Sequence, residues 1–143
     1  SWADIDLEMK TIFLRETKTG TSRYVQLSNQ ATELIKTFDK STKYLFQMRL
    51  QEKPIQQKYL TERTWTLRKK GIMLDIEHWS PHDLRRTVRT GLARLGCPNE
   101  VGEAILGHSK KGIEGTYNLH TYHKECRLWL QKWADYLDDL LIT

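Results

Sequence analysis

Apolar and polar residues alternate along the first 27 residues, as they do in strands that have one covered face. The apolar positions form three short runs, separated at Lys10 and at the turn-like segment 17–20: Ile5, Leu7 and Met9; Ile12 and Leu14; Val25 and Leu27. Short alternating runs separated by turn residues are typical of antiparallel strands. The pattern therefore predicts a small three-stranded antiparallel sheet.

Beyond this segment the apolar spacing becomes helical. Ser28 is a candidate N-cap for a helix with a shared apolar face, formed by Ala31, Leu34, Ile35 and Phe38. A second helix is predicted to end at Gly71, with three expected core positions: Tyr59, Trp65 and Leu67.

The clearest helix signal runs from Ser80 to Gly96. Ser80 is a candidate cap, Pro81 suits the first helical position, and Gly96 suits the end. At about 100° per residue, one face carries His82, Arg85, Arg86 and Arg89, and the opposite face Leu84, Val88, Leu92 and Leu95.

Two further helices complete the predicted fold. A short one ends at Gly107, and a tail helix has one long apolar stripe: Cys126, Trp129, Leu130, Trp133, Leu137, Leu140 and Leu141. The prediction is a mainly α fold with a small three-stranded antiparallel sheet, an α+β domain.

Composition narrows the class of protein. The 143 residues suffice for one domain, and 38% apolar residues with five tryptophans exclude a disordered chain. No apolar run is long enough to span a membrane or to act as a signal segment, and two cysteines make no disulfide framework. A cytoplasmic protein is expected. Because the opening residues SWADIDLEMK lack Met and already alternate, we expect an excised part of a larger protein.

The net charge of +5 is unevenly distributed. Residues 58–94 contain nine Lys and Arg against four acids, whereas the last eleven residues contain three Asp and no base. A basic centre suits a polyanion such as nucleic acid, and a solvated basic face is the alternative.

Four residues could combine in phosphate chemistry. His82 and Arg85 lie three apart at a helix start, where a guanidinium fork and backbone N–H groups both favour an anion. His108 follows Gly107, and Tyr117 lies nine residues beyond it. A tyrosine becomes a nucleophile only with cations and a base nearby. Taken singly, each residue is more simply a surface or packing side chain.

The segments PHDLRRT and LGHS, with Tyr117 nine residues after His108, resemble the tyrosine recombinases, or phage integrases. Residues 116–140 resemble the tail of bacterial prophage and genomic-island integrases. Residues 2–31 resemble the segment that follows the first catalytic arginine of that family. The resemblance covers essentially the whole chain.

The resemblance implies a role for five residues. Tyr117 would attack a DNA phosphate, giving a 3′-phosphotyrosyl link, while Arg85 and His108 bind that phosphate. His82 would assist proton transfer, and Lys18 would protonate the leaving 5′-oxygen. Neither metal nor cofactor is implied. Other basic residues are expected to contact DNA: Arg86, Arg89, Lys110, Lys111 and Lys69.

The implied partner is double-stranded DNA at attachment sites. A tetramer on DNA is expected for the longer protein, with accessory DNA-bending proteins, and a monomer for this chain alone. In the family, the first catalytic arginine lies just before the segment that resembles residues 2–31, so we expect it to be absent from this chain. Arg15, Arg23 and Arg49 lie in other sequence contexts and are not expected to replace it. Strand cleavage by the chain alone is therefore expected to be lower by ~10² to 10³-fold or more.

Several alternatives stay open. A type IB topoisomerase-like enzyme shares the tyrosine chemistry, and a non-catalytic DNA-binding relative could keep the fold. The spacing of His120, His123 and Cys126 is weakly consistent with zinc. Tyr122 is expected to pack, and the tail stripe to cover either its own core or a neighbouring protomer.

Overall fold

The computed structural model describes residues 1–15, 22–56, 58–73, 76–108 and 121–142. After a short 3₁₀ turn, η1 (Trp2–Asp4), three strands form a sheet in the order β1-β2-β3. They are β1 (Ile5–Asp6), β2 (Thr11–Leu14) and β3 (Arg23–Gln26), and both pairings are antiparallel. The predicted sheet is confirmed. Lys10, with φ of 53°, makes the turn before β2, and the predicted turn at 17–20 lies outside the described residues.

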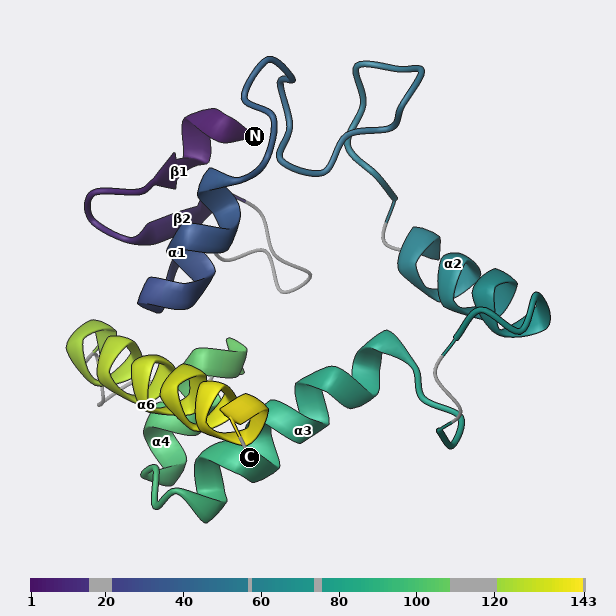
Figure 1. Cartoon of the computed structure of the whole chain (residues 1–143). Helices are drawn as coiled ribbons and strands as arrows, with labels where there is room; N and C mark the ends of the chain where they lie inside the picture. The colour runs from purple at the N-terminus through teal and green to yellow at the C-terminus, as the bar shows by residue number, and fades with distance from the viewer. Residues whose placement is uncertain (16–21, 57, 74–75, 109–120, 143) are drawn as a thin grey trace.

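The described part of the chain contains five α-helices (Figure 1). They are α1 (Asn29–Lys36), α2 (Lys58–Lys69), α3 (Pro81–Arg94), α4 (Asn99–Leu106) and α6 (His123–Ile142). The mainly α fold with a small antiparallel sheet is thereby confirmed. No described helix is both long and apolar enough to cross a membrane.

The predicted caps explain where these helices begin and end. The Ser28 hydroxyl accepts the Ala31 N–H at 3.1 Å, which fixes the start of α1. At α3 the Asp83 carboxylate accepts both the Ser80 N–H at 2.9 Å and the Ser80 hydroxyl at 2.8 Å. Gly107, with φ of 69°, ends α4 in the left-handed region that glycine adopts without strain.

The buried core lies where α6 crosses α3 and α4. Its centre consists of four buried residues, Leu92, Cys97, Val101 and Cys126, and half-buried Trp129 and Trp133 pack around them. Figure 1 shows α6 running past α1 and over α4 and α3, so this helix joins the sheet region to the helical region. The N-terminal part of the predicted tail stripe, with Cys126, Trp129 and Trp133, therefore belongs to the core.

Two of the three core positions predicted on α2 are wrong. The side chains of Tyr59 and Trp65 are exposed, and α2 lies apart from the other helices in Figure 1. Leu34 and Leu84, which were predicted on apolar helix faces, are exposed as well. Helical spacing shows which residues share a face, but nothing described in the structure covers these faces. The C-terminal end of α6 also has exposed apolar side chains, since Leu140 and Leu141 are 55% and 85% exposed.

Candidate functional site

A surface pocket of about 360 Å³ forms where the start of α3 meets the end of α4. It is lined by His82, Arg85, Arg86, Arg89, Thr90, Leu106 and His108. Three of the residues predicted to act on phosphate, His82, Arg85 and His108, are thus brought together. The lining contains three arginines and two histidines but no acid, which makes it a pocket for an anion.

The first wall of this pocket is the basic face of α3. The Ser80–Asp83 cap fixes the helix start, and His82 follows in the first turn with an exposed side chain. Arg85 lies one turn later and is half-buried, and its guanidinium donates to the Leu106 carbonyl at the end of α4. This bond holds Arg85 against the second wall, while a guanidinium still has further N–H groups to offer a ligand.

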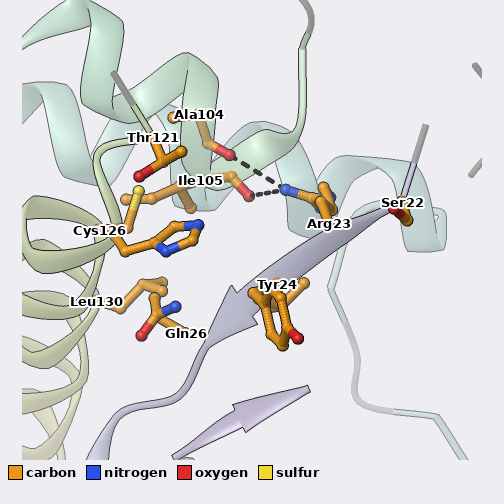
Figure 2. Close-up of a pocket in the computed structure, with 11 residues that line it drawn as sticks. Ser22, Arg23, Tyr24, Gln26, Ala104, Ile105, Thr121, Cys126 and Leu130 are labelled. Atoms are coloured by element: carbon orange, nitrogen blue, oxygen red, sulfur yellow. Dashed lines mark hydrogen bonds between the residues drawn. The ribbon is translucent and has the colours of Figure 1, made fainter. Parts of the chain in front are cut away.

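The second wall is the carboxyl end of α4, where a second arginine binds. Figure 2 shows Arg23 reaching from β3 to this end, where it donates to the carbonyls of Ala104 at 3.1 Å and Ile105 at 3.2 Å. Cations stabilise the negative end of a helix dipole. Burial, and secondly the charge of Arg85, lower the pKa of Arg23.

Gly107 allows this close approach. A Cβ at Gly107 would lie 2.4 Å from Cζ of Arg23, far inside van der Waals contact. The left-handed turn at Gly107 then directs the chain to His108, whose N–H donates to the Glu103 carbonyl at 3.0 Å. The backbone at His108 is therefore set by a glycine turn that is packed against Arg23.

A carboxylate joins His108 to α3. Glu103 Oε2 lies 2.5 Å from Nδ1 of His108, and Glu103 Oε1 accepts from Nε of Arg89 at 2.8 Å. Nη2 of Arg89 also donates a hydrogen bond to Asn99 Oδ1 at 2.5 Å. The hydrogen bonds from His108 and then Arg89 hold the pKa of Glu103 below its usual range.

The expected DNA-contacting residues differ in their surroundings. Arg86 has a side chain that is 75% exposed and lies 3.3 Å from Asp83, whereas the side chain of Arg89 is 26% exposed and ion-paired. Lys69 lies on α2, with Nζ 5.1 Å from the Trp65 ring centroid. The expected residues Lys110 and Lys111 lie outside the described part, as do Tyr117, Lys18 and His120.

A second cavity, of about 340 Å³, lies among β3, α4 and α6 (Figure 2). Its lining includes Arg23, His123 and Cys126. Burial raises the pKa of the Cys126 thiol to about 11, so this buried sulfur is a packing group rather than a nucleophile. Tyr122 packs against the core, as expected.

Sequence reasoning missed Glu103 and Arg23. Glu103 had a usable signal, because an acid five residues before a histidine at a helix end can reach back to the ring. Arg23 had none, since its carbonyl partners lie 81 and 82 residues away in sequence.

The chain is similar in sequence to known proteins. Residues 1–124 match the phage integrase family. The prophage integrase IntZ of Escherichia coli (strain K12) is 32% identical over 147 aligned positions, which cover 98% of this chain and 35% of the relative. The chain thus spans about a third of that relative's length. No solved structure matches the chain. Together, the family match and this relative show that the chain belongs to the phage integrase family of tyrosine recombinases.

Proposed function

We propose that this chain is the catalytic part of a site-specific recombinase, which cleaves and rejoins double-stranded DNA in prophage integration or excision. The observation that carries the proposal is the cationic pocket between α3 and α4, where His82, Arg85 and His108 meet. The name of the E. coli relative, a prophage integrase, supports the same substrate and biological process.

In the proposed reaction, a scissile DNA phosphate occupies this pocket. The Tyr117 hydroxyl attacks phosphorus, a new phosphorus–oxygen bond forms, and the bond to the 5′-oxygen breaks. The products are a 3′-phosphotyrosyl link and a free 5′-hydroxyl. Attack by the 5′-hydroxyl of another strand reverses these bond changes and rejoins the DNA, so neither hydrolysis nor an external energy source is needed.

The pocket residues suit the charge that develops in this step. Arg85 offers a planar fork of donors to the non-bridging oxygens, whose negative charge grows in the transition state. His108 is the second donor to the phosphate, and exposed His82 can take up the proton of the attacking phenol. Lys18 is proposed as the acid that protonates the leaving 5′-oxygen.

The proposed partners follow from this chemistry. Arg86, Arg89, Lys69, Lys110 and Lys111 are the proposed contacts to the DNA backbone. We further propose a cytoplasmic protein that acts on DNA as a tetramer in its longer form.

The test replaces the matching 35% of the E. coli relative with this chain. The chimera is offered a plasmid that carries two attachment sites of that relative, and both recombination and relaxation of supercoils are measured. Recombination that requires Arg85 supports the proposal. Relaxation without recombination would instead indicate a topoisomerase-like enzyme, and DNA binding without any strand cleavage would indicate a non-catalytic relative.

A further inference from the structure

The contact between Glu103 and His108 has chemical consequences for the pocket. An ionised carboxylate only accepts hydrogen bonds, so the imidazole nitrogen that faces it must carry the hydrogen. Nδ1 of His108 lies 2.5 Å from Glu103 Oε2, and the low pKa of Glu103 keeps this carboxylate ionised at neutral pH. In neutral His108, Nε2 is then a bare acceptor.

We infer that Glu103 is a positioning residue that holds the hydrogen of the neutral His108 ring on Nδ1, so that Nε2 donates to an anion in the pocket only when the ring is an imidazolium. This inference rests on the proposed function, because the anion is the scissile phosphate. A neutral ring would turn a lone pair toward the phosphate oxygens, whereas the imidazolium would donate a charge-assisted bond. Glu103 also stabilises that cation.

The surroundings of Glu103 fit this role. Its second oxygen accepts from Nε of Arg89 at 2.8 Å, and Arg89 is held in turn by Asn99. Both carboxylate oxygens are thereby fixed, and the His108 ring is oriented from a rigid helix rather than from a loop. Gly102 leaves room for the Arg89 side chain, because a Cβ at this position would lie 3.2 Å from the Arg89 guanidinium.

The other charged groups around His108 are basic. The groups that face His108 are Glu103 on α4, His82, Arg85, Arg86 and Arg89 on α3, and Arg23 on β3 behind Gly107. All except Glu103 are cationic or can become so. Among these described groups Glu103 is the acid, so Glu103→Gln removes the negative charge that holds the hydrogen on Nδ1.

The experiment follows His108 directly, by long-range nitrogen–proton NMR of the whole chain with ¹⁵N-labelled histidine. In the wild type the neutral His108 ring is expected to carry its proton on Nδ1. Glu103→Gln is expected to shift the neutral ring toward the Nε2–H form. The matched control, Glu100→Gln, removes an exposed acid from the first turn of the same helix and should leave the hydrogen on Nδ1.

The same variants, placed within the E. coli relative, are then tested for covalent attachment to a nicked suicide DNA substrate across a range of pH. Attachment by the wild type should fall as pH rises, because the neutral ring presents a bare Nε2 to the phosphate. In Glu103→Gln the neutral ring carries its hydrogen on Nε2, so attachment should fall less as pH rises, and Glu103→Asp, which keeps the charge, should recover part of the wild-type pH dependence. Thermal melting of each variant separates these effects from loss of folding.

Each outcome bears on a different claim. A wild-type Nε2–H ring, or a ring that stays Nδ1–H in Glu103→Gln, overturns the inference. Attachment with an unchanged pH profile in Glu103→Gln also overturns it and leaves the proposed function standing. If the chain within the E. coli relative forms no adduct at any pH, the proposed function fails, and the NMR result alone decides whether Glu103 holds the hydrogen of His108 on Nδ1.

Discussion

At the scale of single residues, two arginines that line the pocket differ in how closely the protein holds them. Arg89 is ion-paired with Glu103 and is 26% exposed, whereas the Arg86 side chain is 75% exposed. Both lie on the same basic face of α3. Helical spacing alone therefore assigns them one role, and only their partners distinguish them.

The two arginines should respond differently to substitution. For DNA binding, Arg86→Ala should make the negative slope of log K against log[salt] shallower by about 0.9, the value for one phosphate contact. Its thermal stability should be unchanged. Arg89→Ala should lower the melting temperature, because it leaves one oxygen of the half-buried Glu103 carboxylate without its cationic partner. Fluorescence anisotropy at several salt concentrations and calorimetry measure the two effects. Equal stability losses would contradict the distinction.

Gly107 has two requirements, a left-handed backbone and space for Arg23. Gly107→Ala should lose ~1–2 kcal/mol from the backbone conformation alone and more from the contact with the guanidinium. Gly71 provides a matched control, because it has φ of 66° but nothing within 4 Å of its missing Cβ. Chemical denaturation should therefore show a larger loss for Gly107→Ala than for Gly71→Ala. Equal losses would mean that Arg23 moves aside freely.

At the scale of elements, the sequence predicted where the helices begin and end more accurately than it predicted which side chains are buried. Ser28, Ser80, Gly96 and Gly107 lie where predicted because capping depends on neighbours a few residues away. The core assignment of Trp65 failed because burial depends on what packs over a helix. No local pattern contains that information.

The contact between α3 and α6 depends on the absence of one side chain. A Cβ at Gly91 would lie 2.0 Å from Cζ3 of Trp133, inside the ring's own volume. Gly91→Ala should destabilise the protein by ~1–3 kcal/mol through overpacking, against a gain in helix propensity of ~1 kcal/mol. Calorimetry measures the net loss. In the double variant with Trp133→Leu the extra cost of alanine should disappear, and full additivity would refute the clash.

The start of α3 should make stability depend on pH. The Ser80 hydroxyl and N–H, and to a lesser degree Arg86, lower the pKa of Asp83 below its usual value. A carboxylate with a lowered folded-state pKa stabilises the protein above its unfolded-state pKa, and this stabilisation disappears as pH falls through the folded-state pKa. Asp83→Asn should therefore melt earlier than the wild type at pH 7. The difference should shrink below about pH 4, and a constant difference would contradict this origin.

At the scale of the whole molecule, the candidate site is assembled from segments far apart in sequence. Spacing and family resemblance identified His82, Arg85 and His108, and the structure brings all three to one pocket. The contacts of Arg23 and the orientation of Glu103 required the fold. The exposed apolar residues at the end of α6 were predicted as a stripe, but the stripe does not specify what covers them.

The central claim is that Tyr117 is the nucleophile that this pocket serves. The most direct measurement is covalent capture of a nicked suicide DNA substrate by the chain within the E. coli relative, followed by mass spectrometry of the DNA-linked peptide. The account predicts an adduct on Tyr117 that is abolished by Tyr117→Phe and retained by Tyr122→Phe, since Tyr122 packs against the core. An adduct that survives Tyr117→Phe, or one that is lost only with Tyr122→Phe, would contradict it.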